Sequence, residues 1–218
     1  RRTGSPTLEG RVAEALTINE TSFFRDPTPF DAVREDVLPR LVQENAARRE
    51  IRIWCGASST GQEPYSLAIL IREKFPQLAT WNVRILATDI ADSMLARTAA
   101  GTYSSLEMNR GMPASLCIRH FDRVGTAWRV KRHLRAMIEV QKLNLVGAWP
   151  PLGRFDLVLL RNVLIYFDPT TKEAVLNRVA AAMNPGGALL LGCTESVLGL
   201  KTPFRPEPNA RSTVYRLA

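Results

Sequence analysis

Residues 51–66 read IRIWCGASSTGQEPYS, in which an apolar run gives way to a loop of small residues and then to a helical stretch. We expect a strand near Ile51–Cys55 and a helix over Glu63–Phe75, with Pro64 in the first helical turn. Small residues between a strand and a helix let the backbone approach a ligand closely. In doubly wound sheets, ligands bind beyond the carboxyl ends of the strands, so this loop is a candidate binding site.

The same strand-then-helix rhythm continues along the chain and predicts an α/β fold built on a doubly wound, mostly parallel sheet. We expect further strands near Val83–Thr88, Phe155–Leu160 and Ala188–Gly192. Helices are expected over Asp92–Ala100, capped by Asp92 and ended by Gly101, and over Pro169–Met183, before a turn at residues 184–187.

The flanking segments complete one expected domain over residues 19–218, with residues 1–18 as a lead segment, a remnant of a helical region or a linker. Apolar residues at spacings of three and four predict an amphipathic helix over Thr28–Arg48. Alternation over Ser212–Leu217 predicts a last strand that runs antiparallel to the sheet.

The stretch Tyr103–Lys142 breaks the rhythm and predicts an inserted small antiparallel β subdomain. Trp128–Lys131 and Met137–Gln141 alternate as short strands would, and Gly125 provides a turn. Residues 110–135 carry seven cations against one acidic residue, a net charge of +6. Such a field attracts an acidic partner, although charge runs of this kind also occur as plain solvated faces.

Composition excludes several classes of protein. The 218 residues are 45% hydrophobic with a net charge of +8, and no apolar run is long enough to cross a bilayer or to form a secretory signal. We therefore expect a soluble, cytoplasmic protein without membrane insertion. The three cysteines and two histidines lack the spacing of metal ligands, so no metal site is expected.

Three ligands could occupy the loop after the first strand. A nucleoside triphosphate is disfavoured because Gln62 and Glu63 stand where a P-loop needs lysine and a hydroxyl residue. A dinucleotide is disfavoured because Glu63 at the helix start repels a pyrophosphate. S-adenosylmethionine fits better, since it carries an ammonium group and no phosphate. Asp89, at the end of the second strand, can accept hydrogen bonds from its ribose, although a helix cap is an equally ordinary role.

Six blocks in order resemble the CheR chemotaxis methyltransferases, over roughly residues 17–200. The blocks are Thr21-Ser-Phe-Phe-Arg25, Ser59-Thr-Gly-Gln-Glu-Pro-Tyr-Ser66, Ala87-Thr-Asp-Ile90, Asn144-Leu145, Phe155-Asp156 through Arg161-Asn-Val-Leu-Ile-Tyr-Phe167, and Pro185-Gly-Gly187 through Thr194-Glu-Ser196. The resemblance implies an S-adenosylmethionine-dependent methyltransferase that esterifies glutamate side chains on bacterial chemoreceptors and releases S-adenosylhomocysteine.

The resemblance also implies roles for single residues. Around the cofactor, Glu63 would meet the amino group and Asp89 the ribose, and the others would lie near its methionine end, adenine or methyl group: Asn19, Thr21, Arg25, Asn144, Leu145, Leu160, Arg161 and Asn162. Arg25 and Tyr166 are the candidate catalytic residues. Gln62 departs from the pattern, because family members often carry a second glutamate at this position.

The expected chemistry needs no general base, because a glutamate carboxylate, with a reference pKa of about 4.3, is already ionised at neutral pH. In the family, a subdomain like the basic insertion can dock a tethering peptide from the end of a receptor. Two other functions stay open: a cofactor-binding regulatory module, and a methyltransferase of RNA. The few aromatic residues in the basic stretch argue against nucleic acid.

Overall fold

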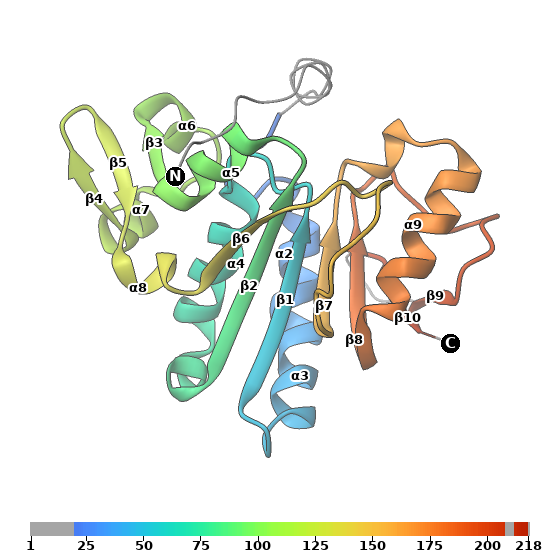
Figure 1. Ribbon diagram of the computed structural model, residues 1–218. Coiled ribbons are helices and arrows are strands. Elements are labelled where there is room, and N and C mark those ends of the chain that lie inside the picture. The colour runs from blue at the N-terminus through green and yellow to red at the C-terminus, as the bar shows by residue number, and fades with distance from the viewer. Residues whose placement is uncertain (1–19, 208–211, 218) are drawn as a thin grey trace.

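The computed structural model describes residues 20–207 and 212–217, which form a seven-stranded sheet with helices on both faces (Figure 1). The strand order is β6-β2-β1-β7-β8-β10-β9. The bounds are β1 (Glu50–Gly56), β2 (Asn82–Asp89), β6 (Ile138–Lys142), β7 (Phe155–Leu160), β8 (Met183–Leu191), β9 (Phe204–Glu207) and β10 (Val214–Leu217). The first five strands in this order are parallel, and β10 is antiparallel to both of its neighbours. The predicted doubly wound, mostly parallel sheet is confirmed.

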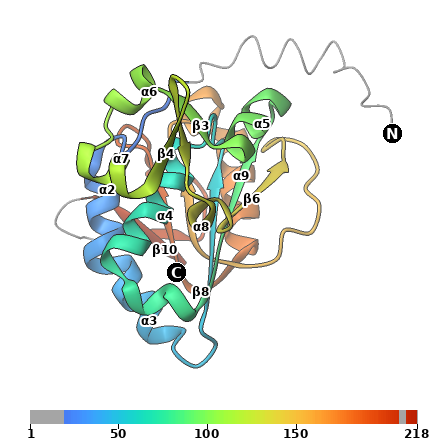
Figure 2. The same cartoon turned by 90° about the vertical axis from the view of Figure 1, so that its left-hand side faces the viewer.

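The central strands β1, β2 and β7 carry apolar runs, at residues 53–55, 85–87 and 157–160, because both faces of the sheet are buried there. In β1, Ile53 and Cys55 belong to one hydrophobic cluster, whereas Trp54 belongs to the other. Figure 2 shows α2 (Pro27–Ala32), α3 (Leu38–Glu44) and α4 (Gln62–Lys74) on one side of the sheet and α9 (Pro169–Ala181) on the other. The sheet therefore has a core on each face, and β1 contributes to both.

The helices follow the sequence with small differences. The expected helix over Thr28–Arg48 consists of α2, a π-helical segment η1 (Val33–Val37) and α3, and it ends at Glu44. Helix α5 (Asp92–Ala100) ends at Gly101, as predicted, but its cap residue is Ala91 rather than Asp92. The carboxylate of Asp92 instead pairs with Lys142 at 2.6 Å. Two 3-10 helices, η2 (Pro76–Thr80) and η3 (Leu164–Tyr166), lie in connections.

The insertion contains the predicted small antiparallel sheet, with strand order β3-β5-β4. Its elements are β3 (Thr102–Ser104), α6 (Ser105–Asn109), α7 (Ala114–His120), β4 (Phe121–Val124), β5 (Ala127–Val130) and α8 (Arg132–Arg135). The expectation that Met137–Gln141 is an antiparallel strand of this sheet is wrong. This segment becomes β6 and pairs in parallel with β2, beginning with the Ile85 N–H that donates to the Met137 carbonyl at 2.8 Å.

The C-terminal part confirms one prediction and corrects another. Strand β10 runs antiparallel to β8, as expected, whereas β9 was not foreseen. Residues 184–187 do not form a turn that separates helix from strand, because they lie within β8 as an irregularity between two pairings with β7. Asp156, opposite this bulge, accepts a hydrogen bond from the Asn184 amide at 2.8 Å. Among the described residues, no helix is long and apolar enough to cross a membrane.

Candidate functional site

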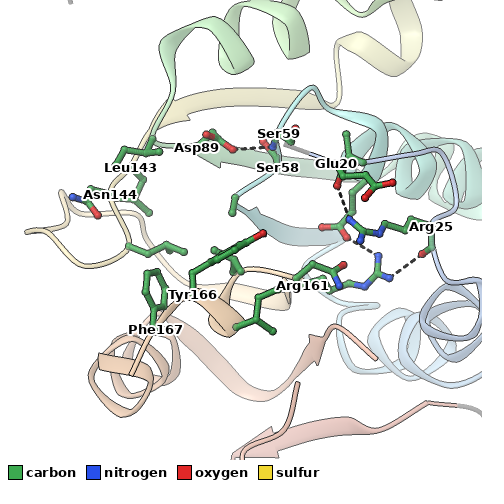
Figure 3. A pocket seen from close by; sticks show the side chains of 18 of the residues that line it. Glu20, Arg25, Ser58, Ser59, Asp89, Leu143, Asn144, Arg161, Tyr166 and Phe167 are labelled. Carbon is green, nitrogen blue, oxygen red and sulfur yellow. Dashed lines mark hydrogen bonds and ion pairs between the residues drawn. The ribbon is translucent and has the colours of Figure 1, made fainter. Parts of the chain in front are cut away.

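A cavity of about 440 Å³ opens at the carboxyl ends of β1, β2 and β7 (Figure 3). Its wall is formed by residues 20–22, 25, 57–59, 63, 89–90, 143–145, 161–163 and 165–167. The chain leaves β1 toward β2 on one side, and β7 pairs with β1 on the other, so the cavity lies at the switch point of the sheet. This is where ligands bind in doubly wound folds.

The loop after β1 forms the floor of the cavity in an uncommon backbone conformation. Ala57 and Ser59 both adopt positive φ angles, 54° and 49°. Such angles are unfavourable for residues with a side chain, so neighbouring elements must hold the loop. The Tyr103 hydroxyl donates to the carbonyl of Thr60 at 2.8 Å, and the Thr98 hydroxyl donates to that of Ser59 at 3.0 Å. The first strand of the inserted sheet thus supports the loop from behind.

Asp89 sits at the end of β2, is 7% exposed and faces the cavity. One carboxylate oxygen accepts the Ser59 N–H at 2.8 Å, and the other accepts the Ala91 N–H at 3.0 Å. The residue therefore organises two loops, as a capping aspartate would. Each carboxylate oxygen has a second lone pair, so the same side chain can also accept hydrogen bonds from a bound diol.

Arg161 lies at the end of β7 with its side chain only 2% exposed. Its guanidinium donates to Glu63 Oε2 at 2.8 Å, to Asp26 Oδ2 at 3.1 Å and to the backbone carbonyl of Arg25 at 2.8 Å. These contacts join β7 to the start of α4 and to the segment that precedes α2. A buried guanidinium needs such partners, because an unpaired charge in the interior is strongly unfavourable.

Glu63 is the acidic group on the cavity wall at the start of α4, and its side chain is 14% exposed. Burial raises the pKa of its carboxyl above the usual range, although the charge of Arg161 opposes this shift. Within the described residues, the hydrogen bond of this carboxylate to Arg161 uses Oε2 only. The other oxygen is available to an ammonium group, and such a ligand would favour the ionised carboxylate.

The two candidate catalytic residues reach the cavity from different parts of the chain. Arg25 is half-buried, and its guanidinium donates to the carbonyl of Glu20 at 2.5 Å. Tyr166 belongs to η3 and is 51% exposed. Figure 3 shows the Tyr166 hydroxyl directed into the cavity and Arg25 on the side of the N-terminal segment. Thr21, from the same segment, also lines the cavity. The structure thus brings Thr21, Arg25 and Tyr166 to one cavity.

The remaining expected residues fall into three groups. Asn144, Leu145 and Asn162 line the cavity, and Asn144 Oδ1 also accepts the Val146 N–H at 3.0 Å. Leu160 is fully buried and does not line the cavity, because its side chain packs where a Cβ on Gly56 would fall. Asn19 lies outside the described residues. Gln62, the departure noted above, is buried and accepts a hydrogen bond from the Thr60 hydroxyl at 2.6 Å.

Sequence reasoning missed several lining residues. Ile90, Leu143 and Phe167 add apolar side chains to the wall, and Figure 3 shows Leu143 and Phe167 on the side of the cavity away from Arg25 and Arg161. Ile90 and Phe167 are the last residues of two of the quoted blocks, and Leu143 directly precedes a third, so position within or beside a block was the available signal. A cavity with one polar, charged end and an apolar wall fits a ligand with a zwitterionic amino acid at one end and a flat base at the other. In the described part of the chain, no group of three or more metal-ligating side chains could hold a metal ion.

Comparison with known proteins decides the family. Residues 19–213 match the family described as CheR methyltransferase, SAM binding domain. The chain belongs to the CheR methyltransferase family. It is 40% identical over 214 residues to chemotaxis protein methyltransferase 1 of Pseudomonas aeruginosa, an alignment that covers 96% of this chain and 77% of the relative. It is 41% identical to chemotaxis protein methyltransferase 1 of Vibrio cholerae, with 96% of this chain and 76% of the relative covered.

The family membership accounts for the cavity. This CheR-family chain is an enzyme that binds S-adenosylmethionine, and the residue types on the wall agree with that cofactor. A third relative, chemotaxis protein methyltransferase Cher2 of Pseudomonas putida, is 36% identical over 214 residues, covering 96% of this chain and 77% of the relative. The expectation of a methyltransferase of the CheR kind is confirmed.

Proposed function

We propose that this enzyme transfers the methyl group of S-adenosylmethionine to glutamate side chains of bacterial chemoreceptors and so forms methyl esters. The observation that supports this most directly is the composition of one cavity, which combines the Glu63 and Asp89 carboxylates with the Arg25 guanidinium. Its described lining contains no histidine, cysteine or lysine that could serve as a general base. An ionised carboxylate is a methyl acceptor that needs none.

In this proposal the cofactor lies along the ends of β1, β2 and β6. Glu63 Oε1 accepts from the ammonium group, Asp89 accepts from the ribose hydroxyls, and Leu143 and Leu145 cover the adenine beside Asn144. Thr21, with Asn19 before it, borders the methionine end. The two carboxylates lie on different elements, α4 and β2, and the Asp89 carboxylate accepts the N–H of Ser59 in the connecting loop. This arrangement fixes the distance between the two carboxylates that would bind the amino group and the ribose of the cofactor.

The acceptor glutamate enters between Arg25 and Tyr166. The cofactor supplies a methyl group on a positively charged sulfonium, and the chain supplies position and removal of water. A guanidinium at Arg25 can hold a carboxylate by two parallel hydrogen bonds and fix the line of attack. Tyr166, with its hydroxyl directed into the cavity, contacts the acceptor from the other side.

The basic insertion is proposed as the contact for the acidic receptor. Arg129 on β5 and Arg132 on α8 are both exposed, and no ion pair to either guanidinium is present among the described residues. Their charge would attract the glutamate-bearing cytoplasmic helices of a receptor, and a receptor-tail peptide could dock on the same small sheet. Action on this part of a receptor would place the enzyme in the cytoplasm.

Two measurements test the proposal. Calorimetry with S-adenosylmethionine and S-adenosylhomocysteine should show binding of both. Incubation with radiolabelled cofactor and a receptor cytoplasmic fragment should then label the fragment, and mild alkali should release the label because esters hydrolyse under these conditions. A fragment with its candidate glutamates changed to glutamine should stay unlabelled. Cofactor binding without transfer to any receptor fragment would overturn the proposed acceptor.

A further inference from the structure

Glu195 is half-buried in the segment that follows β8 and is not part of the cavity wall. Its carboxylate is surrounded by backbone N–H groups. Oε1 accepts from Val163, Leu164 and Ile165 at 2.9, 2.7 and 3.3 Å. Oε2 accepts from Asn162 and Gly192, both at 2.7 Å. Five main-chain donors converge on this one side chain.

Four of the five donors belong to the segment from Asn162 to Ile165, which enters the 3-10 helix η3. Asn162 has a φ of 58°, in the left-handed region that residues with a side chain rarely adopt. The N-terminal N–H groups of a single helical turn have no partner within the turn, so they need an external acceptor. Glu195 provides that acceptor, and it provides negative charge at the positive end of the turn.

This segment contributes several residues to the cavity wall. Asn162, Val163, Ile165 and Tyr166 all line it, whereas the side chain of Glu195 lies behind them. The elements that carry Glu63, Asp89 and Leu145 are not bonded to Glu195 in the described chain. Burial is the largest cause of the raised pKa of the Glu63 carboxyl, and the charge of Glu195 is one of the smaller causes that raise it. A change at Glu195 therefore removes backbone contacts from the wall on the side of Tyr166, and it removes no hydrogen bond of the cofactor-facing residues Glu63, Asp89 and Leu145.

Gly192 gives independent evidence that the space around the carboxylate is closely fitted. A Cβ built at Gly192 would lie 2.6 Å from Glu195 Oε2 and 2.9 Å from the Asn162 nitrogen. The glycine is required here by close approach rather than by its φ, because no positive φ occurs at this position. The Glu195 carboxylate thus connects the residues that follow β7 with Gly192, which follows β8, and the absence of a side chain at Gly192 leaves room for it.

We infer that Glu195 is a positioning residue for methyl transfer, which holds the segment 162–166 so that Tyr166 and Asn162 face the reacting groups. The inference rests on the proposed function, because it concerns the acceptor side of the same cavity. Each carboxylate oxygen accepts at least two N–H groups. An amide NH₂ in place of either oxygen would donate rather than accept, so it would leave at least two backbone N–H groups without an acceptor. Glutamine therefore cannot substitute for this glutamate, although it has the same size.

The test compares Glu195→Gln, Glu195→Ala and Gly192→Ala with the parent enzyme. We expect single-turnover methyl transfer to fall by about 10-fold or more in all three, while the dissociation constant of S-adenosylhomocysteine changes less than about 3-fold. Glutamine should be no better than alanine. Glu173→Gln is the matched control. Among the described residues, the Glu173 carboxylate accepts one backbone N–H, that of Lys201 at 2.9 Å, farther along the connection that carries Glu195. This variant should retain the parent rate.

The outcomes are distinct. A parent-like rate in Glu195→Gln, or recovery by glutamine of what alanine loses, would overturn the inference, because it would leave the side chain a packing role. Equal losses in rate and in S-adenosylhomocysteine affinity would also overturn it. If Glu195→Gln does not fold, Gly192→Ala decides, since it disturbs the same contacts and keeps the carboxylate. A parent enzyme that methylates no receptor contradicts the proposed function instead, before any variant is compared.

Discussion

Arg161 and Glu63 form a 2.8 Å ion pair that joins the end of β7 to the start of α4 directly beside the cavity. The two residues are 98 positions apart in the chain. Arg161 also binds Asp26 and the carbonyl of Arg25, so one buried guanidinium holds together three segments that line the site. The position of Glu63, and with it the polar end of the cavity, depends on this contact.

Replacing Arg161 with methionine should therefore destabilise the protein strongly. The change leaves the Glu63 carboxylate buried without its cation, a situation that costs roughly 3–5 kcal/mol. Urea unfolding followed by circular dichroism measures the loss. Arg119→Met is the control, because Arg119 pairs with Glu73 at 2.9 Å but is 56% exposed, and such pairs contribute at most about 1 kcal/mol. Equal losses in the two variants would contradict the structural role of Arg161.

The raised pKa of Glu63 predicts how cofactor affinity depends on pH. A bound ammonium group needs the ionised carboxylate, and burial shifts protonation of this group to a higher pH than usual. Affinity for S-adenosylhomocysteine should therefore fall as pH drops through that raised pKa, earlier than for an ordinary glutamate. Without ligand, the free energy of unfolding depends on pH in the opposite direction. The folded state keeps the Glu63 proton to a higher pH than the unfolded state does, so stability falls as pH rises from the ordinary pKa of a glutamate through the raised pKa of Glu63. Calorimetry from pH 7.5 downward measures the first effect, and in Glu63→Gln its pH dependence should disappear.

Asp89→Ala should weaken binding of S-adenosylmethionine by about 1.5–3 kcal/mol, the range for losing charge-assisted hydrogen bonds. The variant also removes the acceptor for the Ser59 and Ala91 N–H groups, so the loop after β1 loses support. Asp89→Asn separates the two effects, because it keeps one oxygen and the side-chain size. Unchanged affinity of Asp89→Ala in a calorimetric titration would mean that the aspartate serves only as a backbone acceptor.

Arg25→Ala and Arg25→Lys should both lose turnover, by about 10²-fold if orientation of the acceptor is the main contribution. Lysine keeps the charge but cannot reproduce the planar two-pronged contact. Cofactor affinity should fall much less. The fold should survive, since the contact with Arg161 is made by the backbone carbonyl of Arg25 rather than by its side chain. An Arg25→Ala enzyme that binds cofactor and methylates a receptor at the parent rate would leave Tyr166 as the next candidate.

The Arg129→Glu, Arg132→Glu double variant should raise the Michaelis constant for the receptor and flatten its salt dependence, because the pair acts through long-range attraction. Initial rates at several salt concentrations measure both. The matched control is Lys201→Glu with Arg205→Glu, which makes the same change in net charge. Arg205 lies in β9, at the other end of the main sheet, and Lys201 lies in the connection that leads to it (Figure 1). Identical kinetics in the two double variants would assign the basic stretch to an ordinary solvated surface.

Much of this architecture follows from the sequence alone. Strands β1, β2 and β7 each contain an apolar run, at residues 53–55, 85–87 and 157–160, that is buried on both faces of the sheet, and that pattern predicts a parallel sheet covered by helices. Small residues after β1 and acidic residues at Glu63 and Asp89 are local features, visible without any knowledge of neighbours. Their position at the carboxyl ends of strands follows from the same pattern, so the sequence by itself determined the fold class and the place of the cavity in it.

The tertiary structure decided which distant segments meet. The alternation over residues 137–141 indicates a strand with one buried and one exposed face. It does not indicate which strand lies beside it, so only the structure revealed the parallel pairing with β2. Glu195 stands in one of the quoted sequence blocks, but nothing in the block assigns it a contact; in the structure it accepts N–H groups from a segment about thirty residues earlier. Arg161 is likewise buried only because Glu63 and Asp26 are brought to it. The charge balance of the interior is set by long-range packing, which local sequence pattern does not encode.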